Sequence, residues 1–290
     1  MLYITNDGYK TFTFSGGEEH VELLSNVLDF EIQPVTIVKK VKSSADIMQL
    51  LLLTEIVRRK GFKEVHLIMP YIPYARQDRA TTPGTARSLK VFADLLNSCH
   101  FESVMVIDPH SMVSENLINN MVQLDVVPYL TQFLHKLGDV HAVFSNTVLV
   151  SPDVGALKKV EKYAKEIGIN QVMAFHKERN PATGEIKSIK VISGTDIDVS
   201  GKHVVIVDDI CDGGRTFIEL VKAYPLFKYS SSSRAAESLS LFVTHGIFSQ
   251  GLDTLFDAGF TRLGSTDSFR DTTNFTDPRL TIIPLNVFNT

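Results

Sequence analysis

The sequence predicts an α/β fold built from mainly parallel sheets flanked by helices. Short apolar stretches alternate along the chain with longer segments in which apolar residues recur at helical spacing. Polar clusters follow five of these apolar stretches directly, at 76–79, 108–110, 153, 176–179 and 208–216. Because ligands bind at the carboxyl ends of parallel strands, we expect these clusters to form a functional site.

Length and composition indicate one large or two ordinary globular domains. The chain has 290 residues, a hydrophobic content of 44% and a formal net charge of −4. The sequence has no long basic run, which argues against nucleic acid as the main partner. Two cysteines suit a reducing compartment, the first ten residues lack a signal-peptide pattern, and the apolar runs are too short for a membrane span. We therefore expect a cytoplasmic protein that does not bind membranes.

In the first half of the chain, helices are predicted after Ser44, a possible N-cap, and at about 86–97. The loop 14–19 contains two glycines and is predicted to be a hairpin turn. The predicted strands in this half are 2–5, 11–14, 33–38, 65–69 and 103–107.

In the second half, helices are predicted at 155–167 and about 252–258. A polar loop is expected from His176 through Gly184, and the Ser-rich segment 229–238 is expected to be a mobile surface loop. The predicted strands in this half are 147–150, 171–175, 186–192, 204–207, 239–244, 261–264 and 281–284.

The segment 204–221 has the pattern of a strand, an acidic turn, a Gly-rich loop and a helix start. The acids are Asp208, Asp209 and Asp212, and two glycines follow them. Backbone N–H groups at such a helix start can bind a phosphate, whereas the carboxylates suit sugar hydroxyls or Mg²⁺. The predicted ligand is therefore a phosphorylated polyol. A tight strand-to-helix connection with solvated acids is the alternative.

Two clusters are basic. Segment 76–79 contains two arginines and a glutamine, which could bind a nucleotide phosphate or base. A charged loop with internal Arg–Asp pairing is the alternative. Lys177 and Arg179 alternate with Glu178, so both cations face one way in an extended segment and suit a phosphoryl group in transfer. A solvated charge run is the alternative there.

Two clusters could bind a metal. Asp108 and His110 flank a proline, and a histidine beside a carboxylate could bind a divalent cation or a phosphate. A satisfied structural histidine is the alternative. Asp153 follows a predicted strand and precedes Gly155, so it could equally be the N-cap of the next helix.

Taken together, these clusters resemble one family in order and nearly in spacing, from about Phe14 to Ser249. The chain resembles the ribose-phosphate pyrophosphokinases, also called phosphoribosyl pyrophosphate synthetases. The acidic turn alone indicates only the wider phosphoribosyltransferase-like group, and the PYARQDR and HKER strings are more specific. The strings that carry the resemblance are PYARQDR at 73–79, DPH at 108–110, VSPD at 150–153, HKER at 176–179, VDD at 207–209, DGGRT at 212–216 and THGIFS at 244–249.

The resemblance implies two phosphoribosyltransferase-like domains with the active site between them. We expect residues 1–127 to form the ATP side, possibly rejoined by 275–290, and residues 128–274 to form the ribose 5-phosphate side. The implied reaction transfers the β,γ-diphosphoryl group of ATP to the 1-hydroxyl of ribose 5-phosphate. Its products are phosphoribosyl pyrophosphate and AMP. Family members assemble as dimers or hexamers, so a homo-oligomer is expected.

The resemblance also implies roles for single residues on the ribose 5-phosphate side. Asp208 and Asp209 would hold the ribose hydroxyls. The residues that would bind the 5-phosphate are Asp212, Gly213, Gly214, Arg215 and Thr216. Lys177 and Arg179 would stabilise the transition state, and Arg179 would also contact ribose 5-phosphate.

On the ATP side, Arg76 and Gln77 would bind ATP, while Phe14 and Glu18 would reach the adenine from a neighbouring subunit. His110 is expected to be catalytic and to share Mg²⁺ and its phosphates with Asp153.

The chain departs from the family pattern at several positions. Gly16 replaces an aspartate, Gly213 a threonine and Arg215 a glycine. Arg215 is expected to contact either the 5-phosphate or the neighbouring surface. Segment 80–85 lacks the charged run found in members that are activated by phosphate and inhibited by ADP, and a Ser-Val-Arg-Gly-like string after Val21 is absent. We therefore expect weak or absent allostery of this kind.

Two other functions remain open from the sequence. A nucleobase phosphoribosyltransferase shares the acidic turn but would not need the RQ pair or the HKER run. A non-catalytic regulatory homologue would have lost the catalytic cations, whereas Lys177 and Arg179 are present.

Overall fold

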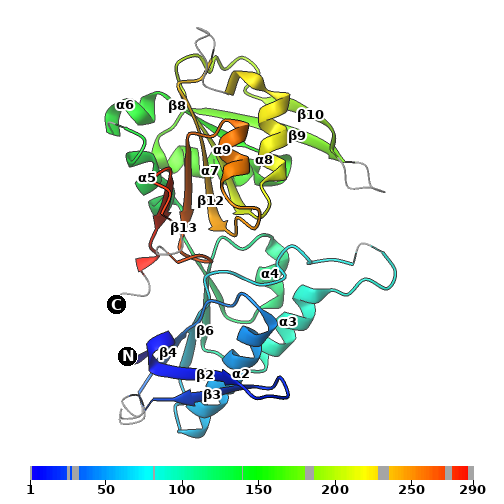
Figure 1. Ribbon diagram of the computed structural model, residues 1–290, viewed down its shortest axis with the longest axis vertical. Coiled ribbons are helices and arrows are strands. Elements are labelled where there is room, and N and C mark those ends of the chain that lie inside the picture. Colours follow the sequence, from blue (N-terminus) through cyan, green and yellow to red (C-terminus); the bar gives the residue numbers. More distant parts are fainter. Residues whose placement is uncertain are drawn as a thin grey trace. The chain divides into compact units, whose positions relative to one another are not determined.

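The computed structural model describes residues 2–24, 27, 33–80, 82–138, 140–179, 186–227, 235–271 and 276–286. The chain forms two compact units, one of residues 1–125 and 286–290 and the other of residues 126–285. Both are α/β units with helices packed on a sheet (Figure 1), as the sequence predicts. No helix in the described ranges has the length and apolarity that a membrane crossing needs.

The first unit contains a five-stranded parallel sheet in the order β1-β4-β5-β6-β7. A separate antiparallel hairpin, β2–β3, packs on helix α2. The elements of this unit are β1 (Leu2–Ile4), β2 (Tyr9–Thr13), β3 (Glu19–Leu23), β4 (Val35–Val38), α2 (Ser44–Arg59), β5 (Val65–Ile68), α3 (Ser88–Asn97), β6 (Ser103–Ile107), α4 (Met112–Leu117) and β7 (Met121–Leu124).

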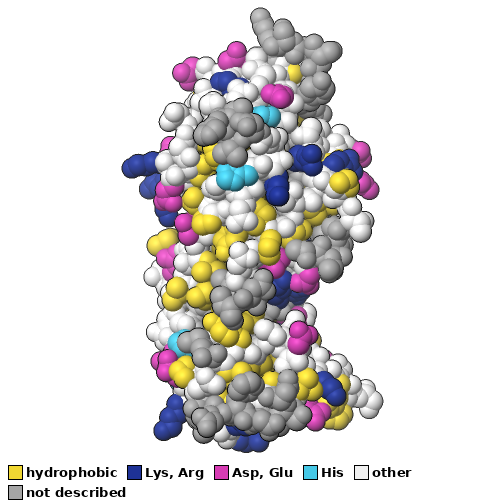
Figure 2. All heavy atoms as spheres, turned by 90° about the vertical axis from the view of Figure 1, so that its left-hand side faces the viewer, with side chains coloured by type: hydrophobic (Ala, Val, Ile, Leu, Met, Phe, Trp, Pro, Cys, Tyr) yellow, Lys and Arg dark blue, Asp and Glu magenta, His cyan; other side chains and the backbone are white. Residues whose placement is uncertain are grey.

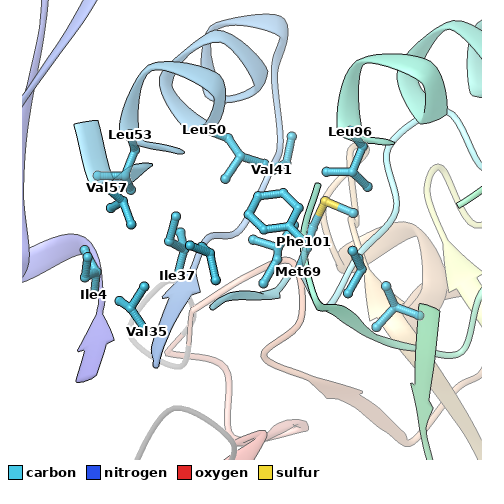
Figure 3. Close-up of a cluster of buried hydrophobic side chains, with 14 of the residues drawn as sticks. Ile4, Val35, Ile37, Val41, Leu50, Leu53, Val57, Met69, Leu96 and Phe101 are labelled. Carbon is cyan, nitrogen blue, oxygen red and sulfur yellow. The ribbon is translucent and has the colours of Figure 1, made fainter. Parts of the chain in front are cut away.

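Helix α2 shows how the core of this unit forms. Leu50, Leu53 and Val57 recur at helical spacing on its buried face. They point toward sheet residues such as Ile37 (Figure 3), and each fully buried leucine contributes roughly 2 kcal/mol. The N-cap is Ser43 rather than the predicted Ser44, because its extended backbone lets its hydroxyl accept a hydrogen bond from the N–H of the residue three positions on.

The second unit contains a seven-stranded sheet in the order β10-β9-β8-β11-β12-β13-β14, parallel except for the β9–β10 pair. Its elements are α5 (Val127–His135), α6 (Val140–Ser145), β8 (Thr147–Ser151), α7 (Val154–Ile167), β9 (Gln171–Arg179), β10 (Ile186–Ser193), β11 (His203–Cys211), α8 (Arg215–Ala223), β12 (Ser238–Gly246), α9 (Asp253–Ala258), β13 (Arg262–Thr266) and β14 (Leu280–Ile283).

Strands β9 and β11 each extend four residues beyond their predicted C-terminal ends. Strand β9 runs through the HKER residues, which the sequence placed in a loop, because β10 pairs with it as far as Arg179. Its pairing with β8 ends at Ala174, so beyond that point β9 and β10 form a two-stranded ribbon (Figure 1). Strand β11 likewise continues through the acids to Cys211, because β12 pairs with it over that length.

Two predicted segments have a different outcome. Segment 275–290 was predicted as a possible return to the first domain, and only its last part returns. Residues 286–290 belong to the first unit, whereas described residues up to Leu285 belong to the second, where β14 pairs with β13. Residues 229–234 of the predicted Ser-rich loop lie outside the described residues. Of the remaining residues, Ala235 and Ala236 are buried, Glu237 is exposed, and Ser238 begins β12.

Acidic and basic side chains are interspersed on the face shown in Figure 2, rather than gathered by sign. This mixture matches the small net charge of −4. On this face, the surface gives no reason to expect a polyanion as partner.

Candidate active site

In the first unit, the predicted ATP residues follow strand β5. Arg76 and Gln77 are exposed, in a turn closed by a 2.8 Å hydrogen bond from the Gln77 N–H to the Tyr74 carbonyl. Tyr74 has a positive φ of 62°. A non-glycine residue in this conformation is strained, and such strain concentrates at functional sites.

Asp78 links this turn to the segment that follows β6. Its carboxylate accepts hydrogen bonds from Ser111 Oγ at 3.0 Å and from Arg79 Nε at 3.1 Å. Burial alone would raise the pKa of Asp78. The two hydrogen bonds and the nearby His110 lower the pKa by more than burial raises it, so it lies below the ordinary value. The structure therefore brings the 76–79 cluster beside exposed His110. Neighbouring Asp108 is buried and has a φ of 47°.

Phe14 and Glu18 lie at the tip of the β2–β3 hairpin, which confirms the predicted turn. The Phe14 N–H donates to the Glu18 carbonyl at 2.8 Å, and Gly17 adopts a φ of 94° that favours glycine. The Phe14 ring is 51% exposed. It contacts the rings of Phe12 and His20, with centroid distances of 5.1 Å and 5.6 Å.

In the second unit, Lys177 and Asp153 form an ion pair. Lys177 Nζ lies 2.9 Å from Asp153 Oδ2, and the lysine side chain is only 13% exposed. Asp153 is also the N-cap of α7, since its Oδ1 accepts from the Ala156 N–H at 3.1 Å. Burial alone would raise the pKa of Asp153. Lys177 and the backbone N–H groups lower the pKa by more than burial raises it, so the pKa lies below its ordinary value and the carboxylate stays ionised. The side chain of Arg179 lies outside the described part.

Asp208 and Asp209 are consecutive residues in the last part of strand β11. Asp209 is 6% exposed, and its N–H donates to Asp208 Oδ1 at 2.9 Å. Desolvation, followed by the Asp209 carboxylate, raises the pKa of Asp208 well above its ordinary value. A pair of acids held this close favours binding partners that donate hydrogen bonds or carry positive charge.

The turn after these acids presents the start of α8. Gly214, the N-cap residue, has a φ of 76° and offers no side-chain cap. No N-cap side chain therefore accepts hydrogen bonds from the first backbone N–H groups of α8. Such a helix start is suited to binding an anion. A Cβ on Gly214 would lie 2.9 Å from Leu255 Cδ2, so glycine is needed there, whereas a Cβ on Gly213 would meet ordinary contacts. Arg215 is exposed at the first helical position.

A buried polar cluster was not predicted from the sequence. The ring of His245, which is 3% exposed, forms a 2.8 Å hydrogen bond through Nδ1 with Ser268 Oγ. Ser268 Oγ in turn donates to the Thr244 carbonyl at 2.9 Å. This cluster holds the end of β12 in place. Just after that strand, the Ser249 N–H donates a hydrogen bond to the Asp212 carbonyl at 3.1 Å. The string THGIFS was visible in the sequence, but it carries no spacing that predicts these partners.

Among the described residues, no three His, Cys, Asp or Glu side chains gather into a metal cluster. Mg²⁺ does not need such a cluster, because bound phosphates can supply some of its ligands. Mg²⁺ binds in this way, through one or two carboxylates and phosphate oxygens. The ionised carboxylate of Asp153 fits such a site, provided that Mg²⁺ displaces Lys177 from Oδ2.

Comparison with known proteins assigns both units. Residues 2–99 match the family model for the N-terminal domain of ribose phosphate pyrophosphokinase, and residues 120–224 match the phosphoribosyl transferase domain. A ribose-phosphate pyrophosphokinase from Aquifex aeolicus is 30% identical over 82% of this chain and 71% of the relative. The chain belongs to the ribose-phosphate pyrophosphokinase family.

Other relatives agree with this family. The ribose-phosphate pyrophosphokinase from Agrobacterium fabrum is 30% identical over 90% of this chain and 79% of its own length. The crystal structure of phosphoribosylpyrophosphate synthetase from Mycobacterium smegmatis has a TM-score of 0.75 at 23% identity, covering 95% of this chain and 85% of that one. This structural match shows that the two proteins share a fold.

Proposed function

We propose that this ribose-phosphate pyrophosphokinase family member is an active diphosphokinase. It transfers the β,γ-diphosphoryl group of ATP to the 1-hydroxyl of ribose 5-phosphate and releases phosphoribosyl pyrophosphate and AMP. The observation that carries the proposal is the acidic end of β11, directly followed by the uncapped start of α8. Carboxylates followed by helix N–H groups that lack a side-chain cap suit the hydroxyls and the phosphate of one sugar phosphate.

Ribose 5-phosphate is the proposed ligand of this turn. Asp208 and Asp209 would accept hydrogen bonds from the ribose hydroxyls. The 5-phosphate would lie on the segment from Asp212 to Thr216, where the helix N–H groups attract an anion. Exposed Arg215 would add a cation to this phosphate site.

ATP is the proposed ligand of Arg76 and Gln77. A guanidinium pairs well with phosphate oxygens, and both side chains are exposed. Phe14 and Glu18 would contact the adenine of ATP bound to a second copy, so the active form would be a homo-oligomer. The exposed aromatic ring and the exposed carboxylate at the hairpin tip suit the stacking and hydrogen bonding that a base requires.

Mg²⁺ is the proposed cofactor, held by His110, Asp153 and the substrate phosphates. When bound, it would neutralise phosphate charge and orient the diphosphoryl group. Lys177 and Arg179 would then stabilise the charge that develops during in-line transfer. The chemistry needs positioned cations more than a strong protein base, and Lys177 and Arg179 would supply such cations.

We place the reaction in the cytoplasm, and we expect weak or absent activation by phosphate and inhibition by ADP. Exposed segment 82–85 contains no charged residue, which supports this expectation, since a site for phosphate or ADP needs cations.

The test is AMP formation from ATP and ribose 5-phosphate with no nucleobase present, measured with and without inorganic phosphate. AMP and phosphoribosyl pyrophosphate in equal amounts are expected. A nucleobase phosphoribosyltransferase would form neither product and would consume phosphoribosyl pyrophosphate when a base is added. A regulatory homologue would be inactive alone.

A further inference from the structure

The β2–β3 hairpin has two different faces. Its inner face packs Val21 and Leu23 into the core of the first unit, where both are buried. Its outer face carries Phe12, Phe14 and His20, whose rings contact one another and are exposed. The direction in which Phe14 points therefore depends on the orientation of the hairpin rather than on packing in the core.

A chain of hydrogen bonds ties the hairpin to the rest of the unit. Glu19 of β3 accepts from Gln49 Nε2 on α2 at 2.6 Å. The carbonyl oxygen of the same amide, Gln49 Oε1, accepts from Lys39 Nζ at 2.8 Å. Lys39 directly follows β4, at the carboxyl edge of the sheet. We call Lys39, Gln49 and Glu19 the relay.

The relay is buried at one end and charged at both. Lys39 is 5% exposed, and its ammonium also lies 3.4 Å from Asp46 Oδ1 and over the ring of Tyr9. The Gln49 amide lies between an ammonium and a carboxylate, so each of its polar ends faces the partner that it prefers. Hydrogen bonds to charged groups are stronger than neutral ones, and bonds in a chain strengthen each other.

The last link reaches the strand that leads to the tip. Thr13 Oγ1 donates to Glu19 Oε1 at 2.8 Å, and these two residues face each other across the hairpin as its last pair before the turn. Gln49 and then Thr13 lower the pKa of Glu19, so the carboxylate stays charged. Phe14 follows Thr13 directly, and Glu18 precedes Glu19.

We propose that the relay positions the hairpin tip, and with it Phe14 and Glu18, for the adenine of ATP. This inference rests on the proposed function, because it assigns Gln49 and Lys39 as positioning residues for that nucleotide. Neither touches the base. A purely structural role would affect the stability of the unit without favouring one substrate over the other.

The test compares Gln49→Leu, which removes both bonds of the amide at similar size, with Glu19→Gln. The second variant keeps an acceptor for Gln49 and a partner for Thr13. Glu55→Gln is the matched control, because it removes the exposed Glu55–Arg59 ion pair from the same helix. The measurements are calorimetric Kd values for Mg·ATP and for ribose 5-phosphate, hydrogen exchange of the amides in 10–23, and Tm.

Gln49→Leu is expected to weaken Mg·ATP binding about tenfold, as the loss of charged hydrogen bonds implies. Its ribose 5-phosphate Kd should change less than threefold, and its hairpin amides should exchange faster. Glu19→Gln makes the bond to Gln49 neutral, so it should weaken Mg·ATP binding less than Gln49→Leu does. Glu55→Gln should bind Mg·ATP nearly as the unmodified protein does. An equal loss for both ligands, a lower Tm with unchanged Mg·ATP binding, or unchanged hairpin exchange would overturn the inference. None of these readouts needs turnover, so a protein that forms no AMP refutes the proposed function without deciding the relay.

Discussion

Replacing Lys177 by alanine should separate catalysis from stability. The lysine is largely buried against Asp153, with Nζ and Oδ2 2.9 Å apart, and removing it leaves the carboxylate without this cation. A hydrogen bond between charged groups contributes about 1–3 kcal/mol, and Asp153 is 34% exposed, so the expected loss is in the lower half of that range. We expect unfolding free energy to fall by about 1–2 kcal/mol and Tm by about 2–8 °C.

The effect on turnover should be larger than this. A cation that acts on the transferring group contributes in the transition state, so kcat should fall about 100-fold or more, while both KM values change less than about threefold. Stopped assays of AMP formation give kcat, and urea melts of the same samples give the unfolding free energy.

Asp153→Asn is the matched control for this substitution. It removes the ion pair from the other side and keeps an oxygen for the Ala156 N–H. If Asp153 holds Mg²⁺, this variant should need more Mg²⁺ and recover activity when Mg²⁺ is raised, whereas Lys177→Ala should not recover. A kcat for Lys177→Ala within tenfold of the unmodified enzyme would refute the catalytic assignment.

Three further predictions concern the sugar-phosphate turn and regulation. Gly214→Ala should destabilise the protein by about 1–3 kcal/mol in urea melts, because of its positive φ and the contact with Leu255, whereas Gly213→Ala should stay within about 0.5 kcal/mol. Equal losses would contradict the steric argument. Arg215→Gly should raise the KM for ribose 5-phosphate, and an unchanged KM would place Arg215 outside the phosphate site. Initial rates should persist without inorganic phosphate and should show no sigmoidal inhibition by ADP; a rate that collapses without phosphate would refute weak allostery.

The local pattern of the chain predicted those parts of the fold that depend on neighbouring residues. Strand β6 has the predicted bounds, because five largely apolar residues between polar flanks suit a buried parallel strand. The hairpin turn followed from Phe14 and the two glycines, and Gly17 has the positive φ that such a turn uses. The α/β class followed from alternation alone.

Features that depend on distant partners were not predictable in this way. The HKER run has the composition of a loop, and only pairing with β10 makes it a strand. Lys39 and Gln49 gave no signal, because a lysine and a glutamine ten positions apart become partners only when β4 and α2 pack. The pairing of Lys177 with Asp153 also arises from the adjacency of β8 and β9, which spacing in the sequence does not state.

The ribbon of β9 and β10 carries Lys177 only three residues beyond Ala174, the last residue of β9 that pairs with β8. Where β9 leaves β8, β10 has a register shift between Val191 and Ser193, opposite Phe175 and Ala174. Bulges of this kind bend strands, so this point would act as the pivot of a lever. Lys177 lies two residues beyond Phe175, which is a lever arm of about 7 Å at the rise of an extended strand. A swing of about 15° about that pivot would then move its backbone by only about 2 Å. Because this distance is short, bending at that point would move the Lys177 ammonium only a little, which favours its accurate placement.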